Sequence, residues 1–184
     1  MLSRARDRAS ACADLIYDLH DIARSATGEA PLVARVAERL ACSADERRWL
    51  VGRYRKVPPK QYAQNVVYVA EDRSFSVVAL TWGPGAQTSI HDHAGWCAVG
   101  VYEGVEHERR YRLCTDASSP YLVHTQSGAL ELGRSVGMVA DGFDIHRVGN
   151  YSRDVTISLH VYGVDIERVG SSIKSRFDAL PVRS

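Results

Sequence analysis

Two histidines one residue apart, His91 and His93, constrain the fold and chemistry of this chain more than any other feature. Side chains alternate between the two faces of a β-strand, so both imidazoles point to the same side if this segment is extended. Two neutral imidazoles that converge from one strand supply half of a metal site. A third candidate ligand, His146, follows a turn at Gly142. We therefore predict that His91, His93 and His146 hold a metal ion.

The chain has the pattern of a β-protein downstream of Pro58 and Pro59. Short segments rich in β-branched and aromatic residues alternate with Gly, Asp, Asn and Ser, which favours a sandwich or a barrel. The residues after Gly163 are charged and rich in turn formers, so we expect them to wrap around the barrel or to fray. The expected strands span residues 65–69, 75–82, 97–102, 108–113, 136–140 and 155–162.

The first third of the chain has a helical pattern. Apolar residues recur at helical spacing after Asp14, and Pro31 suits the first turn of a second helix. Residues 43–46 have the form of a capping box ahead of a short third helix that ends near Gly52. We predict two units, which are a helical segment over residues 1–57 that packs on the barrel and the barrel with a C-terminal extension over residues 58–184.

Composition excludes several classes of partner. The 23 basic and 22 acidic residues nearly cancel, so no global field attracts nucleic acid or an anionic membrane. No apolar run approaches the ~20 residues that span a bilayer, and we expect no secretory signal. The four cysteines are widely spaced without a CxxC pair, which favours reduced thiols over a disulfide framework. We therefore expect a cytoplasmic protein with no nucleic-acid or membrane partner.

Cys97 lies close to the histidine pair, and its role has two interpretations. A thiolate at this position could be a metal ligand. If Cys97 is not a ligand, three neutral imidazoles leave a divalent iron with its full charge and several open positions. Such a site favours a soft, anionic ligand such as a substrate thiolate, and adjacent open positions would place it beside O₂.

The last expected strand carries Ser158, His160 and Tyr162 on one face. The simple interpretation is an edge strand with a solvated polar face. The alternative is a hydrogen-bonded relay along one side of the strand. Such a relay would deliver the Tyr162 hydroxyl to the metal cavity as an acid–base or oxygen-positioning group.

The spacing around the histidine pair resembles the first signature of the cupin barrels, with Gly85 before it and Gly104 after it. Most metal-binding cupins have a glutamate ligand where this chain has Cys97. The segment from His146 to Asn150 is similar to the second cupin signature, without the proline that is usual in it. This resemblance implies a mainly β fold, a jelly-roll-like cupin barrel preceded by α-helices.

The run from Tyr62 to Tyr162 resembles the thiol dioxygenases of the cysteine dioxygenase family. The resemblance implies Fe(II) on the three histidines, a relay through the polar residues of the last strand, and oxidation of a small thiol by O₂ to its sulfinic acid. It also implies a monomer. The matching segments are Tyr62–Asn65, Trp82–Gly85, Ile90–His93, Cys97, His146–Val148 and Ser158–Tyr162.

Gln64 separates subfamilies within this resemblance. Animal-type enzymes have an arginine there that binds the substrate carboxylate, whereas Gln64 resembles the glutamine type, typified by bacterial 3-mercaptopropionate dioxygenases. The glutamine type uses an arginine shortly after the last strand instead. The nearest candidate here is Arg168, although Ser171 is an alternative match. The resemblance thus implies that Tyr62, Gln64 and Arg168 contact the substrate.

Cys97 carries a second implication of the resemblance. Animal enzymes have a cysteine at this position that cross-links to the tyrosine matching Tyr162, whereas the glutamine type usually has glycine. Since this chain combines Gln64 with Cys97, its pattern is mixed. We hypothesise that Cys97 and Tyr162 form a thioether bond during turnover.

The sequence therefore predicts an iron-dependent thiol dioxygenase that acts on 3-mercaptopropionate, cysteine or a related mercapto-acid. Two alternatives remain at this point. Three histidines and water also suit zinc or another divalent metal in a hydrolase or an isomerase. A cupin can also bind a small molecule without catalysing any reaction on it.

Overall fold

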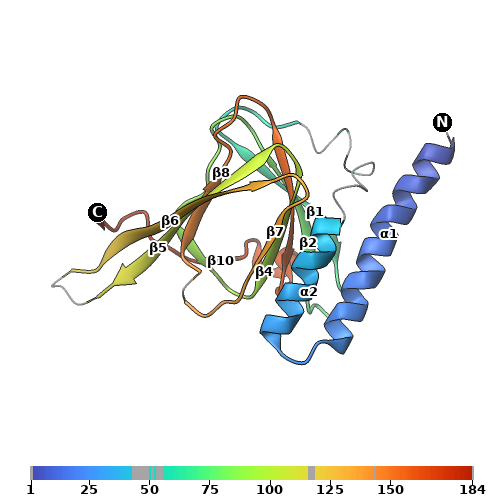
Figure 1. The fold of residues 1–184 in the computed structure, drawn as a ribbon, viewed down its shortest axis with the longest axis horizontal. Helices are drawn as coiled ribbons and strands as arrows, with labels where there is room; N and C mark the ends of the chain where they lie inside the picture. The colour runs from blue at the N-terminus through green and yellow to red at the C-terminus, as the bar shows by residue number, and fades with distance from the viewer. Residues whose placement is uncertain are drawn as a thin grey trace.

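The structure, a computed structural model, describes residues 2–42, 50, 52, 56–115, 119–142 and 144–183. Two β-sheets face each other, and two long helices cover the outside of one of them (Figure 1). Nearly all strand pairs are antiparallel, and strands distant in sequence are neighbours in both sheets. The expected mainly β, jelly-roll-like cupin barrel with preceding helices is confirmed.

The two sheets differ in what covers them. The first is five-stranded and carries the helices on its outer face, while the second is six-stranded and includes a long β5–β6 hairpin that projects from the barrel (Figure 1). In spatial order, the first sheet contains β1 (Tyr62–Val69), β2 (Ser76–Trp82), β9 (Thr156–Tyr162), β4 (Cys97–Glu103) and β7 (Ser135–Met138). The second contains β10 (Ile173–Arg176), β3 (His91–His93), β8 (His146–Gly149), β5 (Val105–Cys114), β6 (Tyr121–Glu131) and β11 (Val182–Arg183).

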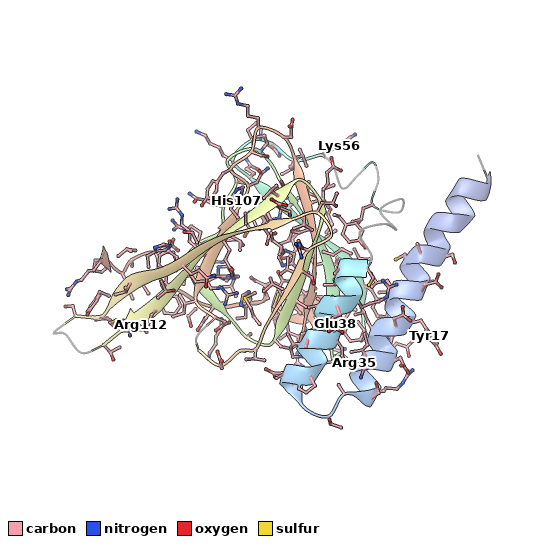
Figure 2. All side chains as sticks on the ribbon, in the orientation of Figure 1. Tyr17, Arg35, Glu38, Lys56, His107 and Arg112 are labelled. Carbon is pink, nitrogen blue, oxygen red and sulfur yellow. The ribbon has the colours of Figure 1, made fainter. Side chains whose placement is uncertain are left out.

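The helices α1 (Leu2–Ser25) and α2 (Glu29–Cys42) pack against each other, and α2 packs on β4 and β7. Their apolar stripes are buried against the outer face of the first sheet, where side chains such as Leu19 and Val36 meet Leu159 of β9. The opposite sides of the helices are exposed, as Tyr17 and Glu38 illustrate (Figure 2). Burial of this shared cluster holds the helical segment on the barrel.

Strand β9 is buried on both faces because of this helical layer. All of its residues are buried, although it alternates polar and apolar side chains. Ile157, Leu159 and Val161 point outward into the cluster beneath the helices. Tyr162, by contrast, belongs to the cluster between the two sheets, together with Val148 of β8. The polar side chains of β9 therefore face the barrel interior and not solvent.

The sequence pattern predicted most of the helices and strands, but not all of the residues at which they begin and end. The apolar stripe after Asp14 lies within α1, which begins much earlier, at Leu2, and Pro31 occupies the first turn of α2 as expected. Residues 43–49 fall outside the described part of the chain, and the predicted third helix lies there. No helix among the described residues has the length and hydropathy needed to cross a bilayer.

Strand β6 and the C-terminal strands are not among the predicted strands. Most of β6 is exposed, so it lacks the apolar alternation on which the prediction depends. The chain after Gly163 forms α3 (Ile166–Val169), β10 and β11. Because β10 pairs with β3 and β11 pairs with β6, this segment wraps around the barrel and does not fray.

Two glycines allow α2 to approach the first sheet closely. A Cβ atom on Gly137 would lie 2.4 Å from Val33 Cγ1 and 3.1 Å from the Val33 carbonyl oxygen. A Cβ atom on Gly100 would lie 2.9 Å from Leu40 Cβ. Since real Cβ atoms do not approach so closely, the helix can keep this position only where these strands carry no side chain.

The close packing of α2 predicts that Gly137→Ala destabilises the fold. The added methyl group overpacks a site already filled by Val33, and such changes cost about 1–3 kcal/mol. Urea unfolding should show this loss, and the Gly137→Ala/Val33→Ala double variant should lose less than the sum of the two single variants. Gly128→Ala is the matched control, because a Cβ atom there meets nothing within 4 Å. Equal stability of Gly137→Ala and Gly128→Ala would contradict this account.

Candidate metal centre

His91, His93 and His146 converge in the barrel interior. His91 and His93 lie on β3, and His146 lies directly opposite His91 on the neighbouring strand β8. The three rings are separated by 4.8–5.0 Å between centroids, and their candidate ligand atoms lie within 4.8 Å of one another. All three residues are buried. The structure thus brings together the three residues that the sequence selected as ligands.

Hydrogen bonds orient all three imidazoles. Nδ1 of His91 lies 2.9 Å from the Ser89 carbonyl oxygen, and Nδ1 of His93 lies 3.0 Å from Asp144 Oδ2. Nδ1 of His146 lies 2.7 Å from Oε1 of the Glu108 carboxylate, on β5. Carbonyl and ionised carboxylate oxygens only accept hydrogen bonds, so each Nδ1 carries the proton and each Nε2 keeps a free lone pair.

The free lone pairs fit a metal ion. His146 Nε2 is buried, and none of the described residues offers it a hydrogen-bond partner. A buried polar atom without a partner is costly in a folded protein unless an ion or water satisfies it. Three imidazole nitrogens suit a divalent transition metal, and the group contains neither a carboxylate nor Cys97.

Carboxylates lie behind two of the three imidazoles, and burial affects the protonation of the site. Burial, together with the neighbouring His146 and His93, lowers the pKa of His91 to about 3. Burial also lowers the pKa of His146, although Glu108 opposes this effect. Burial alone would raise the pKa of Glu108 and of Asp144, but the hydrogen bonds from His146 and His93 lower both. His91 and His146 are therefore neutral, and ionised carboxylates lie behind His93 and His146.

The polar residues of β9 face this group from the opposite sheet and form a hydrogen-bonded chain. The Tyr162 hydroxyl lies 3.0 Å from His160 Nδ1, and His160 Nε2 lies 2.9 Å from Ser158 Oγ. The rings of Tyr162 and His93 have centroids 6.2 Å apart, so the chain ends beside the histidine group. Because β9 is the middle strand of its sheet and fully buried, the solvated-edge interpretation is wrong.

Cys97 and Tyr162 are direct cross-strand neighbours on β4 and β9. Such neighbours have Cβ atoms about 4.5–5.5 Å apart, close enough for their side chains to interact. Burial raises the pKa of the Cys97 thiol, and burial with the nearby Cys97 raises the pKa of the Tyr162 hydroxyl. Both groups are therefore held protonated at neutral pH.

A pocket with an empty volume of about 400 Å³, which includes its open mouth, reaches the three histidines. Tyr62 and Gln64 line it, as the sequence suggests for substrate-contacting residues. Arg168 lies on α3 with an exposed side chain and is not part of the lining, whereas Ser171 is. Within the described part of the chain, no arginine or lysine lines this pocket. Its described polar wall is therefore made of neutral groups and histidines.

Sequence reasoning missed the carboxylates that surround the centre. Glu106 and Glu108 lie two residues apart on β5, and Asp144 lies two residues before His146. The period of two places Glu106 and Glu108 on one face of the strand, which is the same pattern that identified His91 and His93. Attention to acidic residues at this spacing could have found them.

Comparisons with known proteins agree on one family. The family model for cysteine dioxygenase type I matches residues 1–171. Cysteine dioxygenase type 1 of Homo sapiens is 28% identical over 152 residues, which cover 82% of this chain and 72% of the human protein. The Danio rerio protein is 29% identical over 157 residues, which cover 81% of this chain and 72% of that protein.

A solved structure with a similar fold is a more distant match in sequence. An uncharacterized conserved protein with a double-stranded β-helix domain from Klebsiella pneumoniae is 17% identical, with a TM-score of 0.46. The match covers 67% of this chain and 83% of that protein. This structural likeness carries no family assignment. The family model for cysteine dioxygenase type I matches residues 1–171, and by that match this chain belongs to the cysteine dioxygenase type I family.

Proposed function

We propose that this protein is a thiol dioxygenase that uses ferrous iron on His91, His93 and His146. Its substrate is a small mercapto-acid, such as 3-mercaptopropionate or cysteine, and its product is the corresponding sulfinic acid. The observation that carries the proposal is the convergence of three neutral imidazoles and the Tyr162 hydroxyl in one pocket of a chain from this family. The reaction is RSH + O₂ → RSO₂⁻ + H⁺, in which sulfur loses four electrons and both oxygen atoms enter the product.

The donor set fits Fe(II), although three imidazoles also suit zinc. Thiol oxidation needs a redox-active metal, and zinc has no redox chemistry in proteins. When bound, ferrous iron supplies open positions for a thiolate and O₂ and the electrons that activate O₂. Nothing in the described pocket favours a hydrolase or an isomerase over this reaction, whereas the Tyr162 chain and Cys97 have a use in it.

The protein's own residues bind the substrate and hold protons. Tyr62, Gln64 and Ser171 offer neutral hydrogen-bonding groups to the polar end of a mercapto-acid. Leu80 and Val99 add apolar walls that exclude water near the sulfur. Tyr162 lines the pocket beside His93, where its hydroxyl can receive or return a proton at the reacting atoms.

Oxygen consumption tests both the metal and the substrate of this protein. Iron-loaded protein should consume O₂ in the presence of short thiols, and a panel of 3-mercaptopropionate, cysteine and cysteamine should identify the preferred one. Zinc-loaded protein and the His146→Ala variant should consume none. Metal analysis and an oxygen electrode measure both effects.

Activity in iron-free protein would contradict the iron proposal. Iron binding without oxygen uptake for any thiol would instead favour a cupin that binds a small molecule without catalysis.

The second prediction concerns the carboxylate behind His146. Glu108→Gln removes the charge that orients this imidazole, and such changes lower metal affinity about 10–100-fold. Competition with a chelator measures the affinity. Glu131→Gln, an exposed acid on β6, should leave it unchanged. Wild-type affinity in Glu108→Gln would show that the hydrogen bond from His146 does not tune the site.

The third prediction concerns Cys97 and Tyr162. We propose that they form a thioether during aerobic turnover, since they are buried cross-strand neighbours. The bond joins Cys97 Sγ to a ring carbon of Tyr162, and O₂ accepts the two electrons and two protons that are released. Intact-mass analysis should reveal a species lighter by two hydrogen atoms. The species should be missing in Cys97→Ser, and its absence from wild-type protein after turnover would count against the bond.

A further inference from the structure

Glu106 is a buried carboxylate that the function described above does not use. It lies on β5 with 4% of its surface exposed, and its side chain reaches across the barrel to β9. Glu106 Oε2 lies 2.6 Å from Ser158 Oγ and 3.3 Å from His160 Nε2. The indole of Trp82 approaches the same serine, with Nε1 at 2.9 Å from Ser158 Oγ. Glu106 thus extends the hydrogen-bonded chain of β9 beyond Ser158.

The donors and acceptors in this chain follow from chemistry when Glu106 is ionised. An indole N–H only donates and an ionised carboxylate only accepts, so Ser158 accepts from Trp82 and gives its one proton to Glu106. Ser158 then has no proton for His160, and His160 Nε2 must be the donor. A neutral imidazole with its proton on Nε2 accepts at Nδ1. The Tyr162 hydroxyl therefore donates to His160, and its oxygen accepts from the Ser172 side chain and keeps a lone pair for the pocket.

Protonation of Glu106 reverses the hydrogen bonds that link Glu106, Ser158, His160 and Tyr162, while Trp82 still donates to Ser158. A carboxylic acid donates to Ser158, and Ser158 then donates to His160 Nε2. The imidazole proton moves to Nδ1 and is donated to the Tyr162 oxygen, which frees the phenolic O–H to point into the pocket. One proton on Glu106 thus decides whether Tyr162 accepts or donates at the reacting atoms.

Glu106 also lines a second cavity, which the Tyr162 hydroxyl does not reach. The cavity has an empty volume of about 470 Å³, which includes space open to solvent, and is lined by Glu106, Glu108, His146 and apolar residues. Gly128 and Ala129 of β6, which also line it, are exposed. Most of the wall is apolar, but Glu106, Glu108 and His146 offer polar partners, and the volume exceeds the about 30 Å³ that one water molecule takes up, so water can reach the carboxylate. Glu106 therefore lies between the β9 chain and a cavity that water can enter.

We propose that Glu106 accepts the proton that the substrate thiol loses and releases it to this second cavity. The proton passes from sulfur to the Tyr162 oxygen, the Tyr162 proton passes to His160 Nδ1, and the Nε2 proton passes to Glu106. The S–H bond breaks, one O–H bond forms on Glu106, and no electrons are transferred. Glu106 does not touch the substrate and acts through His160. The proposal rests on the proposed function, because only a thiol substrate supplies this proton.

The first test needs no metal and no substrate. Nitrogen-15 NMR of the histidine rings in metal-free protein, with His160→Gln to assign the signal, should show the Nε2–H form of His160. Glu106→Gln should keep that form, because the amide oxygen still accepts from Ser158. Glu106→Leu should give a mixture of both tautomers. An unchanged His160 signal in Glu106→Leu would overturn the role of Glu106 in setting the chain.

The second test measures the proton transfer in iron-loaded protein. Glu106→Gln keeps the tautomer but cannot take a proton, so its kcat should fall about 10²–10⁴-fold while KM for the thiol changes little. Glu106→Ala opens the site to the second cavity, and added formate should restore part of its kcat. Glu131→Gln is the control for an exposed acid and should behave as wild type without and with formate.

The outcomes separate this inference from the proposed function. If wild-type protein consumes no O₂ with any thiol, the proposed function fails, and the NMR result still decides the hydrogen-bond pattern. If the wild type is active and Glu106→Gln keeps its kcat, or formate does not restore Glu106→Ala, Glu106 does not accept the proton.

Discussion

Burial of β9 on both faces is the constraint on which the rest of the structure depends. The helices α1 and α2 cover the outer face of the first sheet, so the apolar residues of β9 point toward them. The strand's period of two then places Ser158, His160 and Tyr162 in the interior. Without the helical layer, the same alternation would favour the opposite orientation, with the polar residues in solvent. The helices α1 and α2 therefore support the site, and none of their described residues lines its pocket.

The interior built in this way is electrostatically negative before any cation enters. Asp144 and Glu108 are ionised beside neutral histidines, and Glu106 lies close by. Their combined effect is visible at Cys97, whose pKa is raised first by burial and then by these three carboxylates. Buried carboxylates are costly unless a positive charge compensates them. Arg110 supplies one positive charge, with its Nε 2.9 Å from Glu108 Oε2, and a divalent cation on the three histidines would supply two more, so the carboxylates favour the occupied centre.

The sequence predicted the centre because its signal is local and periodic. His91 and His93 had to share a face if their segment was extended, and the alternation of β9 selected its polar triad. The start of α1 was not predicted, because its first turns add no strong apolar periodicity. The partnership of Glu106 with Ser158 joins residues 52 positions apart, and such a contact depends on strand order, which no local pattern contains.

The negative charge of the interior also favours transfer of the substrate proton to Glu106. A thiolate formed beside these carboxylates adds a further negative charge, which the metal ion offsets. Transfer of the thiol proton to Glu106 neutralises one of these carboxylates at the moment the thiolate forms, so the net charge inside the barrel does not change. Neutral hydrogen-bond donors such as Gln64 can hold a substrate carboxylate but cannot supply this compensation. Glu106 lies at the Ser158 end of the hydrogen-bonded chain, away from the substrate. It can therefore accept the proton without competing with the substrate for the metal ion.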